Sequence, residues 1–295
     1  MNTPSRRSVV VAIDGSQASD LALDWAVDEA RRRNLPLHLV HARGVDDWWL
    51  MARAPVPREL IDIQDQLLEE RVDRVRRQAP GVVVSSDSAV GHAAKTLIDL
   101  SHDAEVVAMG ARGRGPAKQA LLGSVSAQVS AHAQCPVVVV RGNPVAAPGQ
   151  PRVVVGVDGS ANCQDAVGYA FEQASSRSVG LTAVHAWAEE LVDGLATLAL
   201  SKEQHEAMVQ ERQAMVSEAL AGWCSKYPDV DVREHILRAH PVEALLDEGR
   251  QADLLVVGSR GLGGFTSLLL GSVSRAVLAR AACPVAVIRP AHHQE

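Results

Sequence analysis

Two stretches rich in glycine and serine have the residue types and spacing to bind an anion. They run from Gly110 to Ser126 and from Gly258 to Ser274, and both have the pattern glycine, two residues, glycine, nine residues, glycine-serine. Glycine lets backbone N–H groups approach a ligand closely, and the first turn of a helix offers unpaired N–H groups. Each stretch follows an apolar run and leads into a segment with helical periodicity. We therefore expect a strand, a phosphate-binding loop and a helix in each stretch.

Polar side chains in these loops add to the expected anion site. Arg112 and Arg260 place one guanidinium in each loop, where it can pair with a phosphate. Four hydroxyl groups are further candidate donors, namely those of Ser124, Ser126, Ser272 and Ser274. A single glycine-rich loop would be weak evidence, since many such loops only make tight turns. Two copies that share the same key positions favour ligand binding.

The loops lie in a chain that repeats itself. An Asp-Gly-Ser sequence follows the first apolar run of each half, at Asp14 and Asp158, and Cys-Pro-Val begins at Cys135 and Cys283. The offset between the copies is 144 residues at the aspartates (158 minus 14) and 148 at the loops (258 minus 110). This duplication predicts two domains, 1–143 and 152–295, with a linker at 144–151 in a segment rich in Pro, Gly and Ala.

Within each half, short runs rich in Val and Ile alternate with helical segments. In the first half we expect strands at 9–13, 37–41, 82–85, 106–109 and 137–140 and helices near 19–33, 59–78, 93–101 and 125–133. The second-half helices are expected near 162–176, 201–226, 242–249 and 273–281. Such alternation predicts an α/β fold with a parallel sheet covered on both faces. Ligands of these sheets bind beyond the strand ends at the switch point, so each aspartate and its glycine loop would face one crevice.

Composition excludes several classes of protein. The chain has 295 residues, 47% of them hydrophobic and 22% charged, which is typical of a soluble globular protein. A net charge of −6 argues against a nucleic-acid surface, and the arginine clusters at 31–33 and 74–77 fall on predicted helices. No apolar run approaches the roughly 18 residues of a membrane span, and no secretory signal precedes the first strand. The four cysteines have no metal-binding spacing, so we expect a reducing cytoplasm and no membrane insertion.

Three separated motifs in the same order in each half carry a family resemblance. The Asp-Gly-Ser turn, the glycine-serine loop and the Cys-Pro-Val strand resemble the nucleotide-binding branch of the universal stress protein family over nearly all of both halves. The resemblance implies a tandem member with two Rossmann-like (adenine nucleotide alpha hydrolase-like) domains, each with a five-stranded parallel sheet of order 3-2-1-4-5. It also implies ATP in each crevice, domains paired through their fifth strands, and a role in stress response or growth control.

Carried over position by position, the resemblance assigns the nucleotide contacts. Asp14 and Asp158 would touch the adenosine or organise Mg held by the phosphates, and Ala42 and Ala186 would present backbone groups to adenine. The full set of expected cofactor-binding residues is Ala12, Asp14, Ala42, Gly110, Arg112, Gly113, Gly123, Ser124, Val125, Ser126, Gly156, Asp158, Ala186, Gly258, Arg260, Gly261, Gly271, Ser272, Val273 and Ser274. Ala12 and Gly156 depart from the proline of some members, and His240 is matched to the glycine at Gly91.

Dedicated catalysis is not expected. Phosphoryl transfer needs a metal clamp and a residue that positions the nucleophile, whereas each crevice is expected to hold one carboxylate and one arginine. His41 and His185 could be proposed as bases, but packing under adenine or hydrogen bonding in the core is the favoured interpretation. We expect no catalytic residue and a regulatory switch with an unidentified protein partner. A slow ATP hydrolase or phosphotransferase, and a scaffold without nucleotide, remain the alternatives.

Two other nucleotide motifs are excluded, and two further features stay open. The dinucleotide fingerprint belongs directly after the first strand, which here ends in Asp-Gly-Ser, and no P-loop sequence is present. Trp48 and Trp49 could cover a nucleotide, meet a partner or pack on their own helix. The fifth strands would be unprotected edges unless they pair, so we expect an intrachain pseudo-dimer and, beyond it, a homodimer.

Overall fold

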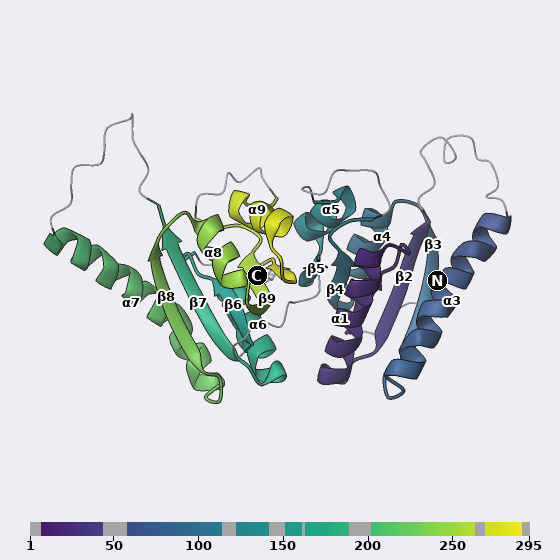
Figure 1. Ribbon diagram of the computed structural model, residues 1–295, viewed down its shortest axis with the longest axis horizontal. Coiled ribbons are helices and arrows are strands. Elements are labelled where there is room, and N and C mark those ends of the chain that lie inside the picture. Colours follow the sequence, from purple (N-terminus) through teal and green to yellow (C-terminus); the bar gives the residue numbers. More distant parts are fainter. Residues whose placement is uncertain are drawn as a thin grey trace, which may run out of the picture. The chain divides into compact units, whose positions relative to one another are not determined.

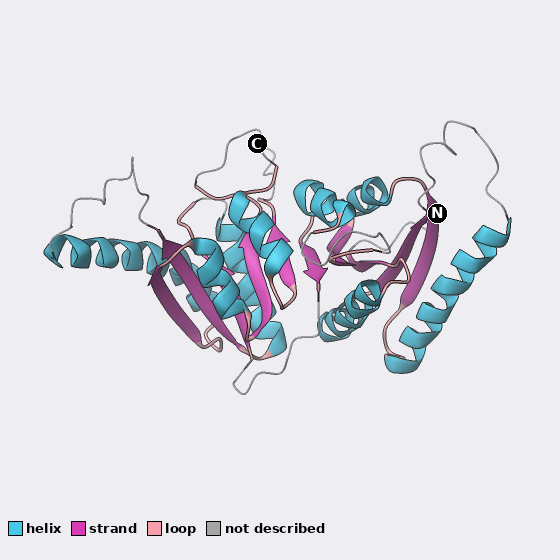
Figure 2. Ribbon diagram, turned by 45° about the horizontal axis from the view of Figure 1, so that its top comes forward, coloured by secondary structure: helices cyan, strands magenta, loops and turns pink. Residues whose placement is uncertain are grey.

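The computed structural model describes residues 7–43, 58–113, 122–141, 151–160, 163–188, 202–262 and 269–290. The chain separates into two compact units, Met1–Asn143 and Pro144–Glu295. Trp48, Trp49 and residues 142–150, which contain most of the expected linker, lie outside the described residues. Each unit is a sheet with helices packed on both faces (Figures 1 and 2).

The first unit is a doubly wound parallel sheet. Its elements are β1 (Ser8–Ala12), α1 (Gln17–Arg33), β2 (Leu37–Arg43), α3 (Arg58–Gln78), β3 (Val84–Val90), α4 (Ala93–Leu100), β4 (Ala104–Gly110), α5 (Ser124–His132) and β5 (Val137–Val140). The strand order is β3-β2-β1-β4-β5, and every pair is parallel. This confirms the expected order 3-2-1-4-5 and makes β1 and β4 neighbours at the switch point.

The second unit repeats this arrangement. Its elements are β6 (Arg152–Gly156), α6 (Cys163–Arg177), β7 (Gly180–Trp187), α7 (Lys202–Lys226), β8 (Val232–Arg238), α8 (Pro241–Gly249), β9 (Ala252–Gly258), α9 (Ser272–Arg280) and β10 (Val285–Ile288). The order is β8-β7-β6-β9-β10, again with parallel pairs. In both units the first strand is central and covered on both faces, so the side chains of Val9, Val10 and Val153 are fully buried.

One predicted strand was misplaced. We expected a strand at 82–85, but β3 begins at Val84, runs to Val90 and pairs with β2 along its whole length. Val83 precedes it with 74% of its surface exposed. The reason is the position of β3 at the edge of the sheet, where half-exposed Ser86 and Ser88 are tolerated. Apolar content therefore does not mark the extent of an edge strand.

Helix ends account for the basic cluster at 31–33. Arg31 pairs with Asp28, Arg32 with the buried Glu29, and Arg33 with both Glu29 and Glu105. Asn34 then ends α1 in the left-handed conformation, with φ of 52°. These arginines lie in the last turn, where positive charge opposes the negative end of the helix dipole. Arg31 lies on a solvated face, as expected, whereas Arg32 and Arg33 are only 23% and 20% exposed and pair with the fully buried Glu29.

A glycine in α6 allows close packing of α7. A Cβ at Gly168 would lie 2.5 Å from the ring of Trp223, so the indole occupies the space that a side chain would need. The Trp223 ring is stacked against Phe171 with centroids 6.4 Å apart, and Tyr227 is stacked against both rings. This aromatic cluster anchors the C-terminal half of α7 to α6, while the N-terminal half of α7 extends past the edge of the sheet (Figure 1).

Three of the four cysteines are buried. All four cysteines are free thiols, and burial raises the pKa of Cys135 and of Cys283 to about 12. Cys135 and Cys283 are 9% and 3% exposed and pack as small apolar side chains. In the part of the chain that the structure describes, every helix is too short or too polar to cross a bilayer.

Candidate functional site

The first strand of each unit ends in a tight carboxylate turn. Gly15 has φ of +78° and Gly159 has φ of +80°, a conformation that favours glycine. In both turns the backbone N–H two residues after the aspartate donates to the Oδ1 atom, at 2.9 Å in Asp14 and 2.9 Å in Asp158. The turn therefore holds each carboxylate at the carboxyl end of a central strand, beside the glycine loop.

The glycine loops close directly against these carboxylates. A Cβ at Gly113 would lie 2.5 Å from Asp14 Oδ2, and one at Gly261 would collide with Asp158 Oδ2. In the second unit the contact is also a hydrogen bond, because the Leu262 N–H donates to Asp158 Oδ2 at 3.1 Å. Glycine is thus needed at both positions for close approach. The expectation that carboxylate and loop share a crevice is met in each unit.

The loops lead into helices that begin without a capping side chain. Gly123 is the N-cap of α5 and Gly271 is the N-cap of α9, and neither helix has a side-chain hydrogen bond at its start. By contrast, α1 is capped by Ser16, whose Oγ accepts from the Ser19 N–H at 3.2 Å. The first-turn N–H groups of α5 and α9 therefore stay available to an external anion. Ser124 and Val125 of α5, with Ser272 and Val273 of α9, line the cavities at these helix starts.

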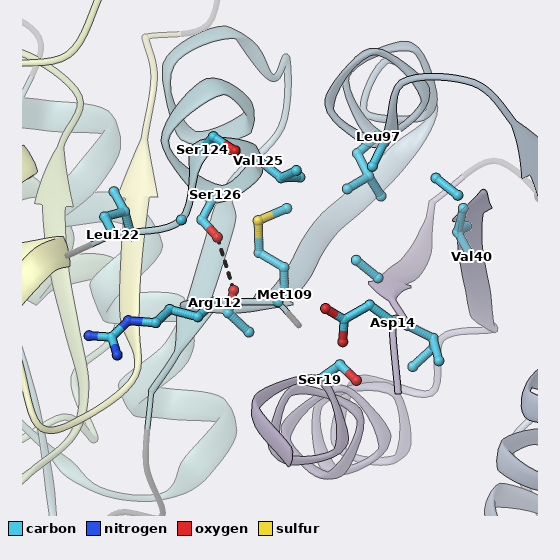
Figure 3. A pocket seen from close by; sticks show the side chains of 17 residues that line it. Asp14, Ser19, Val40, Leu97, Met109, Arg112, Leu122, Ser124, Val125 and Ser126 are labelled. Carbon is cyan, nitrogen blue, oxygen red and sulfur yellow. Dashed lines mark hydrogen bonds between the residues drawn. The ribbon is translucent and has the colours of Figure 1, made fainter. Parts of the chain in front are cut away.

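Two of the four serines do not have the predicted role. The Ser126 hydroxyl donates to the Gly110 carbonyl at 2.9 Å, and the Ser274 hydroxyl donates to the Gly258 carbonyl at 2.6 Å. Figure 3 shows the first of these bonds crossing from α5 to the end of β4. Because each hydroxyl proton is committed to a carbonyl, these serines fix the helix to the strand and are not donors to a phosphate. Ser124 and Ser272 are exposed and keep the predicted role open.

Ser160 bonds differently from Ser16, its counterpart in the first unit. The Ser16 hydroxyl caps the helix that follows it. The Ser160 hydroxyl instead donates to Asp158 Oδ1 at 2.7 Å. The Asp158 carboxylate therefore accepts from Ser160 and from Leu262, so both of its oxygens are engaged by the protein.

A cavity opens at each of these sites. The first has a volume of about 340 Å³ and the second about 580 Å³. Both are bounded by the aspartate, the glycine loop and the helix start, and in the first the side chains of Val40, Leu97 and Met109 supply an apolar wall (Figure 3). All the predicted cofactor-binding residues line one of the two cavities: Ala12, Asp14, Ala42, Gly110, Arg112, Gly113, Gly123, Ser124, Val125 and Ser126 line the first, and Gly156, Asp158, Ala186, Gly258, Arg260, Gly261, Gly271, Ser272, Val273 and Ser274 the second.

The apolar wall was missed by the sequence interpretation. In the second unit it includes Leu245 and Val257, which correspond to Leu97 and Met109 at the offset of 148 residues (245 minus 97 and 257 minus 109). Cys163 stands at the position of Ser19, at the offset of 144 (163 minus 19), and burial raises its pKa. The wall could have been predicted from the sequence. Met109 and Val257 directly precede the first glycine of each loop, and Leu97 and Leu245 are leucines at equivalent positions of the two copies.

The predicted arginine of the first loop does not point where we expected. Figure 3 shows the Arg112 side chain directed away from Asp14 and from the middle of the cavity. A second arginine, Arg141, follows β5 and lies close enough to Arg112 for the two charges to interact. Burial and, to a smaller extent, the charge of Arg112 lower the pKa of Arg141. Arg289 has the same relation to Arg260. Sequence interpretation counted one arginine per loop, although both copies of the Cys-Pro-Val run end in arginine.

The two candidate bases are held in the core. His41 Nδ1 lies 2.6 Å from the Ile13 carbonyl, and His185 Nδ1 lies 2.8 Å from the Val157 carbonyl. A carbonyl can only accept, so Nδ1 carries the proton in both rings. They are 7% and 6% exposed, and His185 has a pKa lowered mainly by burial. This confirms the interpretation of both as hydrogen-bonded core residues.

The correspondence drawn between His240 and Gly91 was wrong. His240 is the N-cap of α8 and His92 is the N-cap of α4, so these two histidines are the equivalent pair. The residue at the place of Gly91 is Ala239, at the offset of 148 (239 minus 91). Gly91 has φ of +137°, whereas Ala239 is absent from the described residues with positive φ. The loop before α8 is therefore a different turn.

No preformed metal site accompanies the crevices in the described residues. Among these residues there is no group of three or more His, Cys, Asp or Glu side chains that could hold a metal ion. Each crevice offers one carboxylate, and that of Asp158 already accepts from the protein at both oxygens. A divalent cation would need most of its ligands from elsewhere.

Sheet order, crevice position and duplication together define a tandem doubly wound α/β protein with one ligand crevice in each unit. A model of the universal stress protein family matches residues 5–141 and again 151–289, and the chain belongs to this family. It is 37% identical over 302 residues to a universal stress protein of Mycobacterium tuberculosis, covering 98% of this chain and 99% of that protein. A universal stress protein of Mycolicibacterium smegmatis is 37% identical over 292 residues, covering 96% and 97%.

A solved structure has the same fold over the full length. The crystal structure of a universal stress protein from Archaeoglobus fulgidus aligns with a TM-score of 0.65 and 23% sequence identity, covering 96% of this chain and 98% of that one. The chain is thus a tandem member of a family named for stress, with the duplicated Rossmann-like fold that the resemblance implied.

Proposed function

We propose that each unit binds ATP and that the protein is a nucleotide-dependent regulatory switch in stress response or growth control. The observation that carries the proposal is the pair of uncapped helix starts at Gly123 and Gly271, which open into cavities lined by glycine loops. N–H groups at a helix start, with the positive end of the dipole, favour a phosphate. Two independent copies of this device support a common ligand.

The rest of each cavity suits a nucleoside. The wall of Val40, Leu97 and Met109 offers an apolar surface for a base, and the backbone at Ala42 offers polar groups at its rim. Asp14 sits between this wall and the glycine loop, where a ribose hydroxyl could donate to its Oδ2 atom (Figure 3). Ligand pockets of this kind are mainly apolar, with a few polar groups that fix orientation.

Magnesium would come with the triphosphate. Mg²⁺ is usually held by one or two carboxylates together with phosphate oxygens and water. Asp14 is the carboxylate of the first crevice that could serve, and Asp158 that of the second. Because Asp158 is engaged by Ser160 and Leu262, we expect a metal there to be held chiefly by the phosphates.

Nucleotide binding can favour one conformation of the protein surface that a partner recognises. At a free concentration one hundred times the dissociation constant, bound nucleotide stabilises the binding-competent state by about 2.7 kcal/mol. Bound phosphates would stabilise the glycine loops against the carboxylates, and an unidentified protein partner would distinguish the filled from the empty crevice. The free cysteines fit a reducing cytoplasm as the place of action.

Slow ATP hydrolysis or phosphotransfer is the rival function. It requires a residue that positions the attacking nucleophile, and the two candidate bases, His41 and His185, are held by the carbonyls of Ile13 and Val157. We therefore assign no catalytic residue. Multiple-turnover phosphate release that is abolished by D14A combined with D158A would favour the enzyme instead.

The decisive experiment is nucleotide release. The purified protein is denatured and the supernatant analysed for ATP, ADP and AMP, and the thermal midpoint is measured with and without ATP and magnesium. We expect released adenine nucleotide, a raised midpoint, or both. The absence of both results would support a scaffold with no nucleotide.

A further inference from the structure

The helix α7 reaches the second crevice at the carboxylate turn. The Met215 thioether packs against Gly159, so closely that a Cβ at Gly159 would collide with the Sδ atom. One turn earlier on α7, Arg212 Nη1 lies 3.2 Å from His185 Nε2. Two side chains of α7 thus contact the residues that shape the turn around Asp158. Neither Met215 nor Arg212 lines the cavity among its described wall residues.

Three hydrogen bonds and one peptide bond connect Arg212 to the glycine loop. His185 donates through Nδ1 to the Val157 carbonyl, so its Nε2 is the acceptor for Arg212. Val157 directly precedes Asp158, and Asp158 accepts from the Leu262 N–H of the glycine loop. Arg212 therefore holds the His185 ring in place, and this ring holds the Val157 carbonyl beside the crevice.

The Arg212 guanidinium is also held in place by an aromatic ring. Its Cζ atom lies 4.7 Å from the ring centroid of Trp187, and this indole is stacked on His185 with centroids 6.1 Å apart. Trp187 follows Ala186, which lines the cavity. A cation over an indole gains stabilisation of its own, so the guanidinium is held from two sides.

The first unit has different residues at these positions. His41 makes the same bond to a carbonyl, but its buried Nε2 has no hydrogen-bond partner among the described residues. The counterpart of Trp187 is Arg43, at the offset of 144 (187 minus 43), and that of Arg212 is Gln64, at the offset of 148 (212 minus 64). The tryptophan and arginine are thus present in the second copy alone.

We propose that Arg212 is a positioning residue of the second crevice, through which ligand occupancy there is communicated to the exposed N-terminal half of α7. This inference rests on the proposed function, since it takes nucleotide as the ligand. A ligand that fixes the carboxylate turn also fixes His185, and the bond from Arg212 then opens less often. Coupling between two sites is reciprocal, so the factor by which ATP stabilises α7 equals the factor that α7 contributes to ATP affinity.

Hydrogen exchange measured by mass spectrometry on the full chain tests the proposal. Exchange is followed with and without ATP and magnesium in the glycine loop, at Gly258–Leu262, and in residues 203–214 of α7. In the native protein we expect ATP to slow exchange in both places, in α7 by about fivefold, the size of one net hydrogen bond. The matching segments of the first unit, Gly110–Gly113 and α3, serve as the internal reference.

Variants separate positioning from general stability. In R212Q we expect ATP still to protect the glycine loop, with affinity lowered about fivefold, but no longer to slow exchange in α7. R212K keeps a charged donor that can reach His185, which the shorter neutral side chain of R212Q does not provide, and loses the planar stack, so it should restore part of the effect. E211Q, a change at the exposed neighbour of Arg212, is the control and should behave as the native protein does.

The outcomes are distinguishable. Protection of the glycine loop without any change in α7, or an unchanged α7 response in R212Q, overturns the role of Arg212 and leaves the proposed function standing. No protection of either glycine loop overturns nucleotide binding and this inference together. Equal loss of the α7 response in E211Q and R212Q would also contradict the proposal, since it would trace the effect to helix stability.

Discussion

The two crevices share a backbone and differ in the side chains that support it. Both have a glycine at φ near +80°, a serine that bonds its helix to the preceding strand, and an uncapped helix start. In the second crevice Asp158 also accepts from the Ser160 hydroxyl, whereas the Ser16 hydroxyl of the first crevice lies near the Arg112 carbonyl, and His185 also accepts from Arg212. The cavity volumes, about 340 and 580 Å³, differ as well. Both copies retain the glycine turn and the uncapped helix start, whereas the side chains around them have diverged.

The largest effect is expected from placing a carboxylate at the N-cap glycines. G271D can cap α9 with its own side chain, and a Cβ there meets its nearest neighbour, the Ser259 carbonyl, at an ordinary 3.4 Å. We expect ATP affinity of the second crevice to fall about 100-fold, because charge-assisted hydrogen bonds are replaced by repulsion. Isothermal titration with ATP and magnesium measures this.

The control is G271A, which adds the Cβ without the charge and should change affinity by less than about threefold. G123D is the matching change in the first crevice, where the Cβ would lie 3.2 Å from the Ala111 carbonyl. If each variant removes one of two binding events, the crevices are independent. Full binding by G271D would contradict the phosphate site.

A smaller effect is expected from the serines that bond helix to strand. S126A and S274A each remove the hydroxyl that donates to a partly buried carbonyl, which should destabilise the unit concerned by about 1 to 2 kcal/mol. Urea unfolding followed by hydrogen exchange assigns the loss to one unit. The exposed serines give the control, since S124A and S272A should leave stability within about 0.5 kcal/mol. A loss of ATP affinity without destabilisation would instead restore Ser126 as a phosphate donor.

The carboxylate contact to the glycine loop tests whether the crevices really differ. In D158N the amide nitrogen cannot accept from the Leu262 N–H, and we expect exchange in Gly258–Leu262 to rise about fivefold. Arg114 stands at the position of Leu262 in the first unit, at the offset of 148 (262 minus 114), and lies outside the described residues. D14N therefore measures the first loop independently. An equal rise in both loops would erase this difference between the crevices.

The smallest effect is a pH dependence of the second unit. The folded-state pKa of His185 is lowered, mainly by burial and also by the charge of Arg212. The unfolded chain therefore takes up the proton first, so the stabilisation is complete above about pH 6.5 and is lost as pH falls below it. We expect a loss of about 1 kcal/mol or less between pH 7 and 5.5 in the second unit.

H185Q should remove this pH dependence, and R212Q should reduce it, because loss of the positive charge raises the pKa of His185. Unfolding midpoints of the two units, measured at several pH values by hydrogen exchange, make the comparison. His38 has a pKa lowered by burial in the first unit, opposed by Asp87, so H38Q is the corresponding variant there. A pH dependence unchanged in H185Q would assign it to another group.

Sequence predicted most of the fold because the apolar strands are buried on both faces, as β1, β4, β6 and β9 are. It failed at β3, an edge strand whose polar residues carry no apolar signal. The residues that line the two cavities could be predicted because glycine spacing reflects close approach, as at Gly113 and Gly261. The pairing of the fifth strands and a homodimer remain predictions, and a monomeric mass in solution would contradict the homodimer.

What the sequence could not give is the use of each side chain. Ser126 and Ser274 look like phosphate donors in a loop, and their bonds to Gly110 and Gly258 become visible when strand and helix are placed together. The contact between Arg212 and His185 joins residues 27 positions apart on different elements. A comparison of the two halves could have singled out Trp187 and Arg212, because Arg43 and Gln64 stand at their positions in the first half.

The missing side chain at Gly168 has a consequence far from α6. The Trp223 ring occupies the space that a side chain at Gly168 would need. Arg212 lies on the same helix, α7, eleven residues and about 16 Å away along the helix axis. Because α7 is one continuous helix, a displacement of its C-terminal half also moves its N-terminal half. A methyl group added at Gly168 would displace Trp223 and, through α7, shift the Arg212 guanidinium without contacting it.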